Sequence, residues 1–199
     1  MTGFSIGGQA GYNHEYANHF VVGVETDIQW GGAKTRGVAN FTDLQPGFGQ
    51  GLGGNIRYGQ DWNGSTRLRL GYAMGNGALT YVTGGLAYAG MSGRIGWTSG
   101  NTVFPIVGAV DGSASGVRLG WAAGFGGEYP ISDRMSIRSE FLYARYSGLP
   151  VGGGGMINAF PTGPMVQALD VRSVGVSTAR VGLNWKMGGF GAAPVVAKY

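Results

Sequence analysis

The sequence contains no cysteine, few charged residues and no long hydrophobic run. The missing cysteines exclude disulfides, thiolate metal sites and a cysteine nucleophile, and they are compatible with an oxidising or a reducing compartment. Charged residues make up 12% of the chain, about half of the share in a soluble globular domain, so a solvated surface would be hard to build. Since no segment reaches the roughly 18 apolar residues of a membrane-spanning helix, the chain could cross a membrane only with strands.

The sequence also lacks a cluster of basic residues and an N-terminal segment with the features of a signal peptide. The formal net charge of +4 comes from scattered arginines, a pattern that does not indicate a nucleic-acid partner. Met1 is followed by TGFSIGGQAGYN, without a charged n-region, an apolar h-region or a small-residue cleavage site. A signal peptide is therefore expected to have been removed or to lie before this start.

The sequence is rich in glycine and in segments whose apolar and polar residues alternate with a period of two. The 42 glycines come with plentiful aromatics and no Gly-X-Y period, so they indicate neither collagen nor a disordered linker. In HFVVGVETDIQWGG, Phe20, Val22 and Val24 alternate with polar positions that include Glu25 and Asp27, as in a strand with one apolar face. Similar segments recur between turn residues along the chain. They predict seven strands, the first at 3–14 and the last at 173–187, joined alternately by short turns and by long glycine-rich loops at about 31–60, 93–116 and 148–172.

The charges and aromatics indicate which face of these strands points inward. Short turns that alternate with long loops are typical of an outer-membrane barrel, and the charged residues are too few to cover an outer wall. Several apolar faces end in Trp or Tyr, which is typical of the interfacial girdles around a lipid-facing band. The residues predicted to form these girdles are Trp30, Tyr72, Tyr88, Tyr129, Tyr143 and Trp185.

The charged side chains are therefore expected inside the barrel. A lumen of eight strands holds mainly side chains, and we expect the acids of 19–31 and 134–146 to pair with Arg67, Arg69, Arg118 and Arg180. Structural salt bridges are the favoured interpretation, and a selectivity path for solutes stays open beside it. The predicted lumen charge network comprises Glu25, Asp27, Arg67, Arg69, Arg118, Glu128, Arg138, Glu140, Arg180 and Lys186.

Six stretches together carry a resemblance to a known family. GGQAGYN is followed by FVVGVETDIQW, DWNGSTRLRLGYA, LTYVTGGLAYA, GFGGEYPISDRMSIRSEFLYARY and RVGLNWKM. In this order the sequence resembles the small porin-like outer-membrane β-barrel family of alphaproteobacteria, over the strands but not the loops. The resemblance implies an all-β, antiparallel up-and-down transmembrane barrel in the bacterial outer membrane. It also implies a mainly structural envelope role and contact with outer-membrane lipid and lipopolysaccharide.

The sequence departs from that family at both ends. Family members usually begin with a further strand, and an open seven-stranded sheet would leave two unpaired edges in lipid, so eight strands are expected in the complete protein. An extra N-terminal strand, or another membrane protein or chain, is expected to cover the gap. Residues 1–187 are predicted to form the barrel domain and 188–199 a C-terminal tail, because that segment is short, glycine-rich and interrupted by Pro194.

Catalytic and ligand-binding patterns are weak in this chain. Gly49, Gly51 and Gly54 match GxGxxG, but roughly two chance matches are expected at this glycine content and no helix follows, so we expect a loop and no cofactor. His14 and His19 are the only histidines and lack a third ligand, so they are interpreted as turn residues and not as a metal site. A barrel enzyme is a rival class, but both histidines fall at the periplasmic end, away from the long loops. No catalytic residues are assigned.

A third class, a surface adhesion or assembly partner, stays open as an alternative function. The expected long loops are more apolar than most solvated loops, and exposed apolar patches often mark contacts. Packing of the loops over the barrel mouth explains them equally well. The residues concerned are Phe41, Phe48, Phe104, Ile106, Val107, Met156, Ile157, Phe160, Met165 and Val166.

Overall fold

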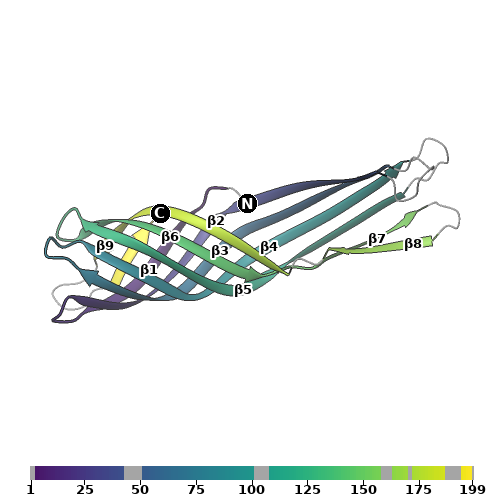
Figure 1. Cartoon of the computed structure of the whole chain (residues 1–199). Coiled ribbons are helices and arrows are strands. Elements are labelled where there is room, and N and C mark those ends of the chain that lie inside the picture. The colour runs from purple at the N-terminus through teal and green to yellow at the C-terminus, as the bar shows by residue number, and fades with distance from the viewer. Residues whose placement is uncertain are drawn as a thin grey trace.

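Eight antiparallel strands form a closed ring in the computed structural model, which describes residues 3–42, 51–100, 108–157, 163–169, 172–186 and 194–198 (Figure 1). Each strand of the ring pairs with the next in the order β1-β2-β3-β4-β5-β6-β9-β10, and β10 returns to β1. No helix in this described part is long and apolar enough to cross a membrane. The ring strands are β1 (Ile6–Glu15), β2 (Phe20–Thr42), β3 (Gly51–Ala73), β4 (Leu79–Gly100), β5 (Gly108–Pro130), β6 (Met135–Ser147), β9 (Ser173–Lys186) and β10 (Pro194–Lys198).

The eighth strand comes from the C-terminal segment. β10 pairs with Gly8–Tyr12 of β1 on one side and with Leu183–Lys186 of β9 on the other. Inside the barrel Gln9 Nε2 donates to Asn184 Oδ1 at 3.2 Å, which ties β1 to β9 across β10. This differs from the expectation that residues 188–199 form a tail and that a further N-terminal strand or another chain covers the edges. Proline is tolerated as the first residue of a strand, and two unpaired edges offer the main-chain partners that a short segment needs.

Most of the expected long loops are strands in the structure. β2 and β3 stay paired from Phe20 opposite Tyr72 to Thr42 opposite Gly51, with bulges after Trp30 and after Gln60. β4 and β5 are equally long, and the hairpin of β7 (Val151–Ile157) and β8 (Gly163–Leu169) pairs with β5 (Figure 1). Away from lipid neither face needs to be apolar, so the alternation that marks a strand in the sequence is lost while the backbone pairing continues. The connections at 43–50, 101–107 and 158–162 lie outside the described residues.

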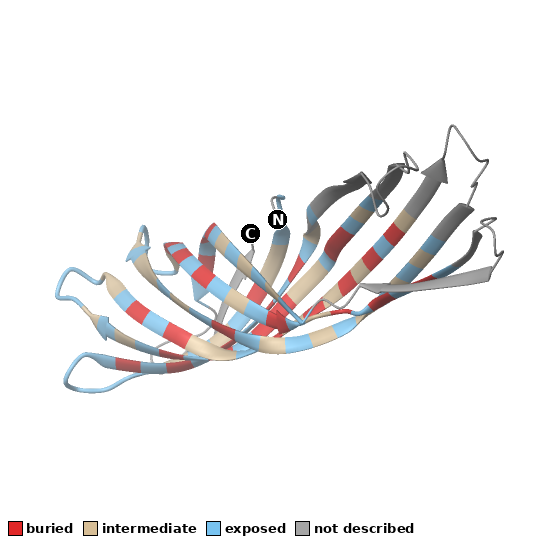
Figure 2. Ribbon diagram, turned by 45° about the vertical axis from the view of Figure 1, so that its right-hand side comes forward, coloured by how far each residue is buried: buried red, intermediate tan, exposed pale blue. Residues whose placement is uncertain are grey.

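The barrel wall is apolar outside and polar inside, as the parity of the sequence predicts. Val22 and Val24 are 40% and 45% exposed on the outer face, whereas Glu25 and Asp27 are each 4% exposed. Figure 2 shows the same alternation of buried and exposed residues along the barrel strands. Five of the six expected girdle aromatics are exposed on the outside, and Tyr88 is half-buried, with its ring 6.3 Å from that of Trp62.

The lumen also contains an apolar layer next to the charged one. Tyr58 Oη donates to Met91 Sδ at 3.4 Å and accepts a hydrogen bond of 3.1 Å from the backbone N–H of Leu149, which lies between β6 and β7. Eight strands leave just enough interior for side chains to fill, so the barrel has a packed core. The buried members of this apolar layer are Tyr58, Ala87, Ala89, Met91, Ala122, Tyr146 and Leu149.

Candidate functional site: the charged lumen

The strand register places acids opposite bases on the inner face of the barrel. Glu25 on β2 stands opposite Arg67 on β3, and Glu140 on β6 stands opposite Arg180 on β9. Residues two apart on a strand share a face, so Asp27 follows Glu25 into the lumen. Opposite charges in cross-strand positions stabilise the sheet, so strand pairing alone brings these acids and bases of the network together.

Glu25 lies among three arginines from two strands. Its Oε1 is 2.6 Å from Nη2 of Arg67, and its Oε2 is 2.6 Å from Nη2 of Arg69. Arg138, on the far side of the barrel, donates to both carboxylate oxygens at 3.0 Å. Arg69 also reaches Oε1 of Glu128 at 2.6 Å with its other terminal nitrogen. One carboxylate therefore joins β2 to β3 and β6, and Arg69 extends the connection to β5.

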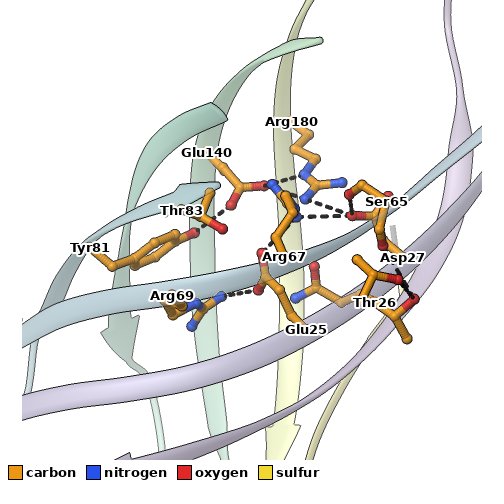
Figure 3. Close-up of polar contacts among 12 residues, drawn as sticks. Glu25, Thr26, Asp27, Ser65, Arg67, Arg69, Tyr81, Thr83, Glu140 and Arg180 are labelled. Carbon is orange, nitrogen blue, oxygen red and sulfur yellow. Dashed lines mark hydrogen bonds and ion pairs between the residues drawn. The ribbon is translucent and has the colours of Figure 1, made fainter. Parts of the chain in front are cut away.

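Glu140 is a second centre of the network (Figure 3). Arg180 donates to its Oε2 through Nε at 2.5 Å, and Arg67 reaches the same oxygen at 3.4 Å. Arg138 donates to Oε1, which also accepts a hydrogen bond of 3.2 Å from Tyr81 Oη. Glu140 thus binds groups from β3, β4, β6 and β9.

Asp27 on β2 links that strand to β3 and β9 across the lumen. Its Oδ2 accepts a hydrogen bond of 2.6 Å from Ser65 Oγ and lies 2.9 Å from Nη2 of Arg67. Arg180 reaches the same oxygen at 3.4 Å. Asp27 and Glu140 therefore share both Arg67 and Arg180.

Tyr81 on β4 contributes its ring as well as its hydroxyl. The guanidinium carbon of Arg69 lies 4.0 Å from the ring centroid and that of Arg138 lies 5.1 Å away, both within cation–π range. Gly126 on β5 makes room for this ring, because a Cβ there would lie 2.4 Å from Tyr81 Oη. Tyr81 and Ser65 were not among the residues predicted for the lumen, although each has the inward parity of its strand.

Eight of the ten predicted residues meet in this network, and two do not. The eight are four carboxylates and four guanidiniums, so their formal charges cancel, and all are buried or nearly so. Arg118 is only half-buried and points into the lumen near the apolar layer, without an ion pair to any described residue. Lys186 has the inward parity but is exposed at the end of β9, where its backbone N–H donates to Arg134 O at 2.9 Å. The pairing expected for Arg118 is therefore replaced by pairing of Arg138.

The network fits mutual stabilisation better than chemistry on a substrate. A buried charge without a partner is costly, and here each of the four carboxylates has at least one arginine within 3.0 Å. Two cavities beside the network have volumes of about 20 and 10 Å³, one lined by Asp27, Gln60 and Tyr146 among others and the other by Gln9 and Arg69 among others. Such volumes hold isolated water molecules only.

The other candidate motifs behave as surface or strand features. His19 lies in the turn between β1 and β2 with φ 66°, and its Nδ1 is 3.5 Å from Oε1 of Glu15, with both side chains exposed. Among the described residues no group of acids and histidines is arranged to hold a metal ion. Of the GxGxxG match, Gly49 lies outside the described residues, and Gly51 and Gly54 belong to β3. The side chains of all ten apolar loop residues named above lie outside the described part.

A closed ring of strands with an apolar outer wall, aromatic girdles and an ion-paired interior defines a transmembrane β-barrel of the bacterial outer membrane. Residues 1–186 match the model of the family described as outer membrane protein beta-barrel domain, and the chain belongs to this family.

Two relatives and one solved structure extend the comparison. The chain is 31% identical over 184 residues to a 31 kDa outer-membrane immunogenic protein of Brucella melitensis biotype 1, and equally to that of Brucella suis biovar 1. The matched segment covers 92% of this chain, and the chain spans 66% of the length of these curated relatives. The crystal structure of a major outer membrane protein from Thermus thermophilus aligns over 100% of both chains with 11% identity and a TM-score of 0.34.

Proposed function

We propose that the protein is a structural outer-membrane barrel with a closed lumen and that it conducts neither ions nor solutes. The observation that carries the proposal is the ion-paired layer formed by Glu25, Asp27 and Glu140 with their arginines, which spans the lumen from β2 to β9. The apolar layer around Tyr58 and Met91 closes the interior a second time. A porin-like function would require an aqueous path through both layers.

The proposal assigns no catalytic role to the lumen carboxylates. A general base needs a free lone pair within reach of a substrate, whereas Glu25, Glu140 and Asp27 are each 4% exposed and already accept from arginines. Their function in this proposal is to hold strands of the barrel wall together. The Brucella relatives, named as outer-membrane immunogenic proteins, are compatible with a non-enzymatic role.

Ion conductance of the refolded protein in planar lipid bilayers tests the closed lumen. We expect no stepwise current increase, because ions would have to pass two packed layers. A matched control is the variant R67M/E140Q, which removes one charge of each sign at the centre of the network. Stable conductance steps of the unaltered protein would refute the proposal, and a change in their size or ion selectivity in this variant would show that the charges line the permeation path.

A second candidate function is that of a surface adhesion or assembly partner outside the cell. Strands β2 to β5 and the β7–β8 hairpin extend together well beyond the barrel (Figure 1). A paired extension of this kind would present the main chain and exposed side chains of these strands outside the membrane. Antibodies raised against a peptide of residues 51–60 of β3 should bind intact cells. Binding only after lysis would refute an external position of this extension.

A further inference from the structure

Exposed cations lie on the outer face of the extended strands. Arg57 on β3 stands directly opposite Arg94 on β4. One row nearer the barrel, Lys34 stands opposite Gly59, and its Cγ would lie 3.9 Å from a Cβ at that glycine. Arg57, Arg94 and Lys34 are all exposed.

The two arginines border a trough on this face. Its volume is about 500 Å³. Gly96 lies in it without a side chain, so that Asp111 Oδ1 and Asn55 Oδ1 would lie 3.1 and 3.5 Å from a Cβ at this position. We name this feature the outer cationic trough. Its side-chain lining is Asn55, Arg57, Arg94, Asp111 and Ser113, with Gly96 between them.

The charges of the trough are not balanced as the lumen charges are. Like charges directly opposite each other on neighbouring strands are destabilising. In the lumen Arg67, Arg69, Arg138 and Arg180 each contact a carboxylate, but neither Arg57 nor Arg94 has an ion pair or side-chain hydrogen bond within the described part of the chain. Asp111 is the one acid lining the trough, and it is not within ion-pair distance of either guanidinium. The trough therefore has an excess of positive charge available to an anion.

The trough lies beyond the aromatic girdle, on the side of the long strands. Arg94 is six positions past Tyr88 on β4, and Arg57 is five positions past Trp62, which stands opposite the girdle residue Trp30. At about 3.3 Å per residue and a tilt of about 40°, this places them roughly 12 to 15 Å above the girdle. The interfacial layer of a simple bilayer is only about 5 to 8 Å thick on each side, so the trough faces the sugar-containing headgroups of the outer leaflet.

We propose that the outer cationic trough binds a phosphate group on the sugar headgroup of outer-leaflet lipopolysaccharide. Arg57 and Arg94 supply paired N–H donors, whose planar geometry matches phosphate oxygens. Ser113, which stands opposite Arg94, and Asn55 supply neutral hydrogen-bonding groups. Lys34 adds positive charge on the membrane side, and Asp111 opposes binding. Basic residues beside a membrane recognise anionic headgroups in the same way.

The test compares lipopolysaccharide binding by charge variants in detergent micelles, measured by titration calorimetry. The variant R57Q/R94Q is expected to bind about 30-fold more weakly than the parent, and each single variant about fivefold more weakly. The matched control is R134Q/K186Q, which removes the same charge from exposed residues at the opposite end of the barrel and is expected to bind like the parent. Asp111→Asn, which removes the opposing charge, should bind more tightly.

Two further arms identify the group that is bound. Chemically dephosphorylated lipopolysaccharide should bind the parent as weakly as intact lipopolysaccharide binds R57Q/R94Q, and inorganic phosphate at equal concentration should not compete. Competition by inorganic phosphate would show a site for the free anion instead of the lipid. Equal binding by R57Q/R94Q and R134Q/K186Q, with both variants folded by gel mobility, would overturn the proposal and leave the closed-lumen proposal untouched.

Discussion

Removing Glu25 and Arg138 together should cost the barrel no more than removing either alone. Arg138→Met leaves one excess negative charge in the lumen, and Glu25→Gln leaves one excess positive charge among three arginines. Removing one partner of a buried pair typically costs about 3 to 5 kcal/mol. The Arg138 variant should lie near the lower end, because Glu25 keeps Arg67 and Arg69 at 2.6 Å.

In the double variant every remaining charge keeps an opposite partner. Arg69 retains Glu128 at 2.6 Å, and Arg67 retains Asp27 at 2.9 Å. Arg180 and Glu140 remain in contact with each other. We therefore expect the double variant to be no less stable than either single variant, which corresponds to a coupling energy of about 3 kcal/mol.

The assay is denaturant unfolding of the barrel in lipid vesicles, followed by tryptophan fluorescence and heat-modifiable gel mobility. The control cycle is Glu15→Gln with His19→Gln, an exposed pair 3.5 Å apart, whose coupling should be below about 1 kcal/mol. Additive costs for Glu25 and Arg138, within about 0.5 kcal/mol, would refute the reasoning. They would mean that water screens each charge separately, as in a wide channel.

Three further predictions concern the wall and its closure. Val24→Arg should lower the free energy of unfolding in vesicles by about 2 to 4 kcal/mol if the position lies near the bilayer midplane, and an unchanged value would contradict its lipid-facing position. Val196→Pro removes one main-chain donor from β10, so the same assay should show a loss of about 1 to 3 kcal/mol, and no loss would argue against β10 as a wall strand. Gly126→Ala should cost about 1 to 3 kcal/mol by displacing Tyr81, whereas Gly152→Ala, with no atom within 4 Å of the new Cβ, should be tolerated.

Local alternation was sufficient to predict the strands that face lipid. In β2 the apolar and polar residues separate by parity, and the register with β3 follows it from Phe20 to Trp30. Past Trp30 the chain passes a bulge into a glycine-rich, polar stretch, and there the prediction of a loop was wrong. In this extension glycines and polar residues occupy most positions, so main-chain pairing continues with little apolar alternation in the sequence, and the extension of β2 to β5 was not predicted.

The amino-acid sequence was enough to predict the class of protein. Few charges, no apolar helix, period-two strands and aromatic ends leave a lipid-facing barrel with its acids and arginines inside. Lipid imposes this arrangement, because on every strand each outward-facing side chain within the membrane has to be apolar.

Which charges meet and how the ring closes could be seen only in the folded barrel. Glu25 and Arg138 are 113 positions apart, and Gln9 and Asn184 are 175 apart, so no local pattern relates them. Arg118 and Lys186 have the inward parity of their network neighbours, yet one lies beside the apolar layer and the other at the barrel end. The parity of a residue predicts the face of the strand on which its side chain lies, but it does not predict the height of that side chain along the barrel axis. The height depends on strand register and on the closure through β10, which are properties of the whole ring.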